Sequence, residues 1–190
     1  MRKVLVSIVG RDRPGIVYQV SKALADYRCN VIEASQTTLL GEFAGLFSCG
    51  MPKDGSLEEF NGVLDKALEG SDLAHWVNEV TDSPSAGFEN SDIYEPYVVT
   101  VRGLDRLGVI PEFSGAMAGF DVNVNTLRAI SLDHEAVEPK DRQVMMFFEL
   151  SVPKAVNQGA FRQALNLIAE ELDMEMSLQH RDIFEAMHRL

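Results

Sequence analysis

The chain has 190 residues, a formal net charge of −12 at pH 7 and 46% hydrophobic residues. This length suits one ordinary domain or two small ones, and the apolar content is enough to form a core. The sequence contains no cluster of Lys and Arg. Direct binding to a nucleic-acid backbone or to an anionic membrane is therefore not expected, because both interactions need positive charge.

The two cysteines, Cys29 and Cys49, both lie in apolar stretches. They predict buried thiols in a reducing compartment and not a disulfide scaffold. The N-terminal apolar run KVLVSIV is too short for a signal peptide and leads directly into a turn. No apolar run approaches the ~18 residues that a membrane span needs. We therefore expect a cytoplasmic protein that makes no contact with a membrane.

The first part of the chain predicts the element order β-α-β-β-α-β. An apolar run at 3–9 indicates a strand, and the Pro14-Gly15 pair marks a turn into a helix. Apolar residues at helical spacing then predict that helix, with a stripe formed by Ile16, Val20, Leu24 and Tyr27. The elements that follow are strands at 31–40 and 43–51 with a hairpin turn at Gly41-Glu42, a helix at 57–70 and a strand at 74–80.

The turn before the first helix occurs twice in the chain. GRDRPGIVYQV runs from Gly10 to Val20, and GLDRLGVIPEF runs from Gly103 to Phe113, again after an apolar run. Residues 4–31 align with 97–124 without a gap. The identical pairs include Gly10/Gly103, Asp12/Asp105, Arg13/Arg106, Gly15/Gly108, Ala23/Ala116, Ala25/Ala118, Asn30/Asn123 and Val31/Val124. A single such turn would match by accident, but its repetition indicates two copies of one structural unit.

The second half repeats the same pattern of elements with three differences. Its elements are a strand at 96–102, a helix from 109, strands at 123–132 and 143–152, a helix that carries Phe161, Leu165, Ile168 and Leu172 on one face, and a strand at 173–179. Leu107 replaces the proline of the first turn, and Pro111 is expected to delay the start of the helix. The loop Asp133–Arg142 is longer than its counterpart. An amphipathic segment at 181–190 is expected to pack on its own protein.

These patterns predict an α+β protein with two ferredoxin-like βαββαβ domains in tandem. The expected domains are 1–80 and 97–190, the second with a short C-terminal helix, and the polar, turn-rich segment 81–96 is the expected linker. The strands carry apolar residues on both alternating faces, whereas the helices can cover only one face. The second face is therefore expected to meet the other repeat or another chain, and we expect a homodimer.

The two repeated turns are candidate anion-binding sites. A helix N-terminus offers free N–H groups and a favourable dipole, and a glycine lets a ligand approach the backbone. The candidate residues of the turns are Asp12, Arg13, Pro14, Gly15 and Ile16 in the first repeat and Asp105, Arg106, Leu107, Gly108 and Val109 in the second. A purely structural turn, with its Asp and Arg side chains solvated or in salt bridges, is the alternative.

Two asparagines mark the far end of the first helix in each repeat, just where the next strand begins. Asn30 is followed by Val31, and Asn123 is followed by Val124. Each asparagine can present an amide that both donates and accepts beside a site. Each can equally cap the helix in left-handed geometry. Both interpretations remain open at this point, and all four residues are candidate ligand contacts.

The turns and the helix resemble the ACT domain family. The resemblance rests on the DRPG-type turn, the I-V-x-x-V-S-x-x-L-A helix from Ile16 to Ala25 and the helix end C-N-V-I. It covers nearly the whole chain twice, and tandem ACT domains with little else are most similar to the glycine cleavage system transcriptional repressor family. The resemblance implies the βαββαβ fold and a regulatory module that binds small ligands, usually amino acids, where two ACT domains meet.

For this chain the resemblance implies that the turns supply backbone N–H groups and that Asn30 and Asn123 supply amides. The ligand's carboxylate would lie at Gly15 or Gly108, and its ammonium would meet the asparagine of the other repeat. The resemblance favours glycine or a similar amino acid as ligand. It also implies a protein partner, a DNA-binding activator, and no direct contact with DNA. We expect the pair of Gly15 and Asn123 to matter more than the pair of Gly108 and Asn30.

Two other functions compete with an amino-acid-binding regulator: an interaction module without a ligand, and a small enzyme. The four histidines, His75, His134, His180 and His188, show no metal-ligand spacing. Neither a P-loop nor a dinucleotide-binding glycine motif occurs in the sequence. Cys29 or Cys49 paired with a histidine would be a nucleophile, but core packing explains both cysteines better. We therefore expect no catalytic residue, no metal and no cofactor.

Overall fold

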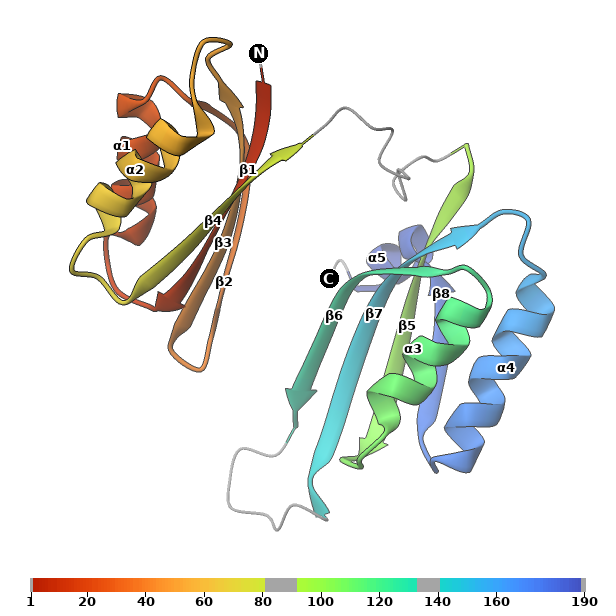
Figure 1. Cartoon of the computed structure of the whole chain (residues 1–190). Coiled ribbons are helices and arrows are strands. Elements are labelled where there is room, and N and C mark those ends of the chain that lie inside the picture. Colours follow the sequence, from red (N-terminus) through yellow and green to blue (C-terminus); the bar gives the residue numbers. More distant parts are fainter. Residues whose placement is uncertain (1, 81–91, 133–140, 189–190) are drawn as a thin grey trace. The chain divides into compact units, whose positions relative to one another are not determined.

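The computed structural model describes residues 2–80, 92–132 and 141–188, and the chain divides into two compact units, Met1–Pro84 and Ser85–Leu190. Each unit contains one four-stranded antiparallel sheet with two helices packed on one of its faces (Figure 1). The predicted α+β class, with two ferredoxin-like units in tandem, is confirmed.

The first unit has the strand order β2-β3-β1-β4. Its elements are β1 (Arg2–Arg11), α1 (Ile16–Asp26), β2 (Asn30–Leu39), β3 (Glu42–Met51), α2 (Leu57–Leu68) and β4 (Leu73–Val80). The core forms between the sheet and the two helices, where Val4, Val6 and Ile8 of β1 meet the apolar stripes of α1 and α2. Both cysteines are buried, as the sequence predicts.

The second unit repeats this order as β6-β7-β5-β8. Its elements are β5 (Tyr94–Leu104), α3 (Val109–Gly119), β6 (Asn123–Ser131), β7 (Gln143–Pro153), α4 (Gln158–Glu171), β8 (Glu175–His180) and α5 (Arg181–His188). Its core shares no residue with that of the first unit. Strand β5 starts at Tyr94, inside the segment expected as linker. Residues 81–91 of that segment and 133–140 of the long loop lie outside the described residues.

Two local predictions are wrong, and the backbone explains both. The hairpin turn lies at Leu40-Gly41, not at Gly41-Glu42, because φ is positive at Leu40 (53°) and Gly41 (81°). That pattern is typical of the type I′ turn, whose twist matches the flanking strands. Helix α3 begins at Val109, the position equivalent to Ile16, and is not delayed by Pro111. Proline is tolerated there because first-turn N–H groups have no helical acceptor.

The edge strands β2 and β6 carry a bulge at the same place. In β2 the register with β3 shifts between Val31 and Glu33, so Ile32 is the extra residue. In β6 the register with β7 shifts between Val124 and Thr126, so Asn125 is the extra residue. The repeat is therefore conserved between the two units down to a single irregularity of the backbone.

Helix α5 packs against β5 and β8 of the second unit, on the sheet face opposite α3 and α4 (Figure 1). The ring of Phe184 in α5 meets that of Phe147 in β7 edge-on, with 6.4 Å between centroids. Val98 of β5, which is not part of the main core, is only 4% exposed on this face. The expectation that this segment packs on its own protein is confirmed for its described part.

None of the helices in residues 2–80, 92–132 and 141–188 is long and apolar enough to span a membrane.

Candidate functional site

The two repeated turns share one backbone geometry. Gly15 and Gly108 stand immediately before α1 and α3 with φ of 93° and 96°. This left-handed region favours glycine, because a side chain there is strained. A Cβ atom built onto either glycine would have no neighbouring atom within 4 Å. Backbone conformation therefore requires these glycines, and open space lies where a side chain would otherwise stand.

Helices α1 and α3 differ from the other long helices at their N-termini. Ser56 accepts hydrogen bonds from the N–H groups of Glu58 and Glu59 at the start of α2, and Asn157 caps α4 in the same way. No described side chain caps α1 or α3. The first helical bond of α1 runs from the N–H of Gln19 to the carbonyl of Gly15, so residues 16–18 have no helical acceptor. These donors and the helix dipole favour an anion.

The second turn offers one donor fewer than the first. The first helical bond of α3 runs from the N–H of Glu112 to the carbonyl of Gly108. The three preceding residues are Val109, Ile110 and Pro111, and proline carries no N–H. An anion at this turn therefore has two helical N–H groups available, against three at the first turn.

Each turn is attached to the neighbouring hairpin through its aspartate. The N–H of Asp12 donates to the carbonyl of Gly41 at 2.8 Å, and that of Asp105 donates to the carbonyl of Arg142 at 2.7 Å. The Asp12 carboxylate also accepts from the Thr38 hydroxyl at 3.3 Å. The aspartates therefore help to hold the turns beside the hairpins.

The arginines of the turns contact groups of their own units. Arg13 donates to the side-chain oxygen of Gln19, whose amide in turn donates to the carbonyl of Ala67 in α2. Arg106 lies 3.5 Å from the carboxylate of Asp173, in the turn before β8. These contacts favour a structural role for both arginines, and their contact with a ligand stays a prediction.

A hollow of about 350 Å³ opens beside the first turn. Asp12, Arg13, Gly15, Ile16, Val17, Tyr18, Gln36, Thr38 and Phe43 line it. The structure thus brings four predicted residues together with polar groups of β2 that the turn sequence does not reveal. Alternation along the predicted strand would place Gln36 and Thr38 on one face. Their proximity to the turn depends on the hairpin register, which is not evident in the sequence.

The two asparagines lie far from the turns of their own units. Asn30 pairs with Gly50 at one end of β3, whereas Arg11, which leads into the turn, pairs with Glu42 at the other end. Eight residues of strand correspond to about 27 Å. Asn123 has the same displacement from its own turn, because it pairs with Ser151 and Leu104 pairs with Gln143. One small ligand cannot contact the turn and the asparagine of the same unit.

The asparagines are not the helix caps that one interpretation predicted. Left-handed φ values occur at Arg28 (59°) and Asp121 (54°), two residues before each asparagine. Asn30 and Asn123 are the first residues of β2 and β6. The side-chain amide of Asn123 donates to Asn125 at 2.6 Å, and Asn125 donates to the hydroxyl of Ser151 at 2.8 Å. The capping prediction is therefore wrong, and the amide interpretation stays a prediction.

Comparison with known proteins adds to this geometry. A sequence model of the ACT domain matches residues 2–69. A UPF0237 protein of Methanopyrus kandleri is 30% identical over 93 residues, which are 49% of this chain and 96% of that protein. A UPF0237 protein of Listeria monocytogenes is 36% identical over 74 residues, 38% of this chain and 80% of that protein. The chain belongs to the UPF0237 family of ACT domain proteins. The resemblance drawn from the repeated turns is thereby confirmed.

Solved structures with two such units share the fold of this ACT domain protein. A protein of unknown function from Galdieria sulphuraria superposes with a TM-score of 0.78 at 24% identity, covering 94% of this chain and 98% of its own. A "putative glycine cleavage system transcriptional repressor" superposes with a TM-score of 0.65 at 18% identity, covering 94% and 96%. At these identities the likeness concerns the fold. ACT domains are regulatory modules that bind amino acids, and this chain is a regulatory protein of that class.

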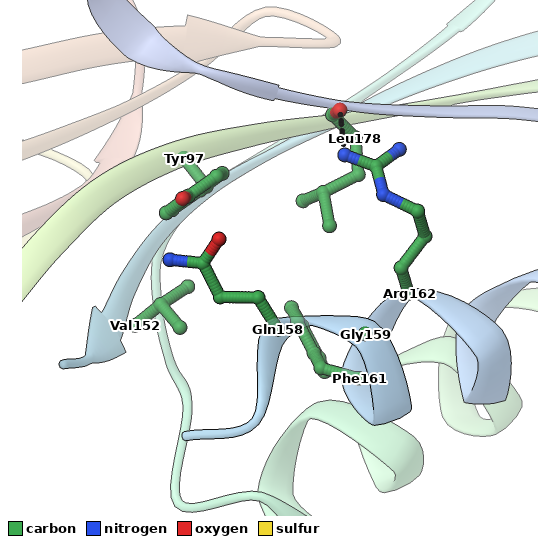
Figure 2. Close-up of a pocket in the computed structure, with 7 residues that line it drawn as sticks. All are labelled: Tyr97, Val152, Gln158, Gly159, Phe161, Arg162 and Leu178. Atoms are coloured by element: carbon green, nitrogen blue, oxygen red, sulfur yellow. Dashed lines mark hydrogen bonds between the residues drawn. The ribbon is translucent and has the colours of Figure 1, made fainter. Parts of the chain in front are cut away.

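A second cavity, of about 240 Å³, lies in the second ACT unit beside the start of α4 (Figure 2). Tyr97, Val152, Gln158, Gly159, Phe161, Arg162 and Leu178 line it. Its polar groups have partners within the unit. Arg162 donates to the carbonyl of Leu178 at 3.0 Å, the dashed line in Figure 2, and Gln158 donates to Glu95 at 3.0 Å. None of the predicted site residues lines this cavity.

The two cysteines of this ACT domain protein are poor nucleophiles. Burial raises the pKa of the Cys49 thiol to about 11 and also raises that of Cys29. Both thiols are therefore protonated at neutral pH, whereas thiolate is the reactive form. Over the described parts of the chain, no group of three or more His, Cys, Asp or Glu side chains could hold a metal ion.

Cys49 should make stability fall at alkaline pH. The ordinary pKa of 9.0 applies to the thiol in the unfolded chain, and the pKa of about 11 applies to the folded protein. The contribution of the buried thiol to the free energy of unfolding is therefore complete below pH 9 and is lost as the pH rises through 11. Urea unfolding between pH 8 and 11 measures this effect, with Cys49→Ala as the control. The variant should show a flatter pH dependence than the original protein. Parallel curves would contradict the raised pKa.

Proposed function

We propose that this ACT domain protein is an amino-acid-responsive regulator that acts through a protein partner. The observation that carries the proposal is the uncapped N-terminus of α1, which opens onto the hollow beside Gly15. A ligand carboxylate at this place would accept hydrogen bonds from the N–H groups of residues 16–18, and the helix dipole would favour its charge. Amino acids are the ligands that the family binds, and each carries such a carboxylate.

The ammonium group of the ligand has two candidate partners. Within the first unit, Asp12, Gln36 and Thr38 line the same hollow and offer oxygen atoms. The amide of Asn123 or Asn30 would contribute only from a different ACT unit, because each lies about 27 Å from the turn of its own unit. Glycine is the first amino acid to test, since a fold neighbour is described as a "putative glycine cleavage system transcriptional repressor".

The proposal includes how the protein passes on its signal. A net charge of −12 disfavours direct DNA binding, so a protein such as a DNA-binding activator is the proposed partner. We place the protein in the cytoplasm as a homodimer. Ligand binding would shift the population of its states, and the partner would read that shift.

The binding experiment is a screen of the twenty amino acids by calorimetry, beginning with glycine. The best ligand is then measured against Thr38→Val, Gln36→Ala, Asn123→Ala and Asn30→Ala. Loss of one hydrogen bond to a charged group corresponds to about 1.5–3 kcal/mol, or roughly ten- to a hundredfold in affinity. If only the β2 variants, Thr38→Val and Gln36→Ala, weaken ligand binding, the ligand site lies within one unit. Weakening by an asparagine variant requires a second unit.

The glycine itself is tested by Gly15→Val and Gly108→Val. Both changes strain the backbone, so melting without ligand is measured beside binding, and Gly15→Asn serves as the control because asparagine tolerates left-handed φ. We expect Gly15→Val to reduce affinity more than Gly108→Val, since the first turn has one more N–H donor. The absence of any amino acid binding below millimolar concentration, or binding that none of the variants changes, would refute the proposal in favour of a ligand-free interaction module.

A further inference from the structure

The cavity beside the start of α4 combines an apolar wall with a positive charge (Figure 2). Its apolar wall consists of three buried side chains, Val152, Phe161 and Leu178. The polar side chains around it are those of Tyr97, Gln158 and Arg162. Cavities that bind small molecules typically have a mostly apolar lining with a few placed polar groups, and this cavity has that composition.

The first unit carries different side chains at the equivalent places of its second helix. Counted from the residues that cap α2 and α4, Gln158 corresponds to Leu57 and Arg162 corresponds to Asn61. Leu57 packs against the core of the first unit. Asn61 donates to the carbonyl of Leu57 in its own helix at 2.8 Å. The positive charge beside the cavity therefore belongs to the second unit and is not a property of the shared fold.

The guanidinium group of Arg162 has donors that its own unit does not use. One of its N–H groups donates to the carbonyl of Leu178 at 3.0 Å, and Arg162 as a whole is exposed. A guanidinium group carries five N–H donors, and among the described residues that of Arg162 forms no ion pair. A carboxylate matches such a planar group best, because it accepts two parallel hydrogen bonds from it.

The ring of Tyr97 forms the wall of the cavity across from Arg162 (Figure 2). The ring packs against the core of the second unit. Burial raises the pKa of the phenol, so this wall carries no charge at pH 7. The carboxylate of Glu95 does not line the cavity, and it accepts from the Gln158 amide at 3.0 Å and from the Tyr97 hydroxyl at 3.5 Å. One side of the cavity thus offers an aromatic surface, and the other side offers a cation.

We propose that this cavity binds a small carboxylic acid with an apolar body, whose carboxylate contacts Arg162 and whose body lies between Tyr97, Phe161 and Leu178. The site goes beyond the proposed function, whose ligand lies beside the turn of the first unit. An apolar cavity of about 150 Å³ can hold benzene. The volume of about 240 Å³ is therefore enough for one ring, or a branched chain of similar size, together with a carboxylate.

The experiment titrates the full chain with phenylacetate and with isocaproate, a branched aliphatic acid, by calorimetry and by NMR. Phenylacetamide and phenethylamine resemble phenylacetate in size but carry no negative charge. We expect both acids to bind with a dissociation constant of about 1 mM or lower, and the amide and the amine to bind at least about tenfold more weakly. The backbone signals of residues 158–162 should shift, whereas those of residues 57–61 should not.

Two variants separate the contribution of the charge from that of the apolar wall. Arg162→Gln should weaken phenylacetate binding about tenfold or more and leave phenylacetamide binding unchanged, because it removes only the charged hydrogen bonds. Tyr97→Val, which introduces the residue of the first repeat, should weaken the binding of both probes about two- to tenfold. Arg128→Gln is the control, since it removes the same charge from an exposed residue of β6 that does not line the cavity. Melting without a probe shows whether each variant is folded.

Three outcomes would overturn the inference. They are the absence of binding by either acid at about 10 mM, equal affinity for the acid, the amide and the amine, and phenylacetate binding that Arg162→Gln does not change. Signals that shift at residues 15–18 and 36–38 instead would place the probe in the hollow of the first unit. In that case the inference fails while the proposed function stands. Glycine has no apolar body, so its binding tests the proposed function separately.

Discussion

Replacement of Gly10 by alanine should destabilise the first ACT unit by at least about 3 kcal/mol, whereas Gly103→Ala should be tolerated. A Cβ atom at Gly10 would lie 2.0 Å from the backbone oxygen of Asp72. That carbonyl cannot withdraw without disturbing β4, since Gly10 pairs with Leu73. At the equivalent Gly103 the nearest atoms are 3.1 Å away and belong to the flexible side chain of Met174.

Hydrogen exchange resolved by peptide measures this difference unit by unit, together with urea unfolding. Gly10→Ala should speed exchange in α1, α2 and the strands of the first sheet. Gly103→Ala should leave exchange in both units near that of the original protein. If both changes have equally small effects, the backbone at Asp72 can move away from a Cβ atom at position 10 at little cost in free energy.

Replacement of Val98 by aspartate should release α5 or unfold the second unit, at a cost of about 3 kcal/mol or more. Val98 is 4% exposed beneath α5, and a carboxylate without a partner is costly to bury. The matched change is Leu5→Asp, at the same position of the first repeat. Leu5 lies on the face of the first sheet opposite α1 and α2, where no described helix packs, so that change should cost only about 1 kcal/mol.

Urea unfolding at micromolar protein concentration or below compares the two aspartate variants. Exchange of residues 181–186 reports separately on α5. We expect Val98→Asp to lower the unfolding midpoint and to remove protection from α5, and Leu5→Asp to change the midpoint little. If the two variants unfold alike, α5 does not provide the cover that buries Val98.

The order of elements could be predicted because local patterns determine it. Neighbouring residues are enough to recognise strand alternation, the helical stripe that begins at Ile16 and the repeated Asp-Arg-x-Gly turn. The exact turn at Leu40-Gly41 was not predictable in the same way, because a leucine in left-handed conformation contradicts its own preference. Pro111 does not delay α3 because the penalty of proline disappears in the first helical turn.

The candidate site was harder to predict than the fold because it depends on distant residues. Gly15 could be predicted as part of a turn, but its neighbours Gln36 and Thr38 come from β2 through the register of the hairpin. The asparagines show the opposite case. Asn30 follows α1 closely in sequence, yet α1 runs back along the sheet and carries it to the end opposite the turn.

The repeated bulges at Ile32 and Asn125 have a consequence for aggregation. Strands β2 and β6 each form one of the two edges of their sheet, and an exposed edge is a template on which further chains can add. A bulge bends the strand and interrupts its pairing pattern. An incoming strand can match the residues on one side of Ile32 but not continue in register across it. The bulge thus shortens the continuous edge that β2 or β6 offers for fibril growth, although all ten residues of β2 are exposed to solvent.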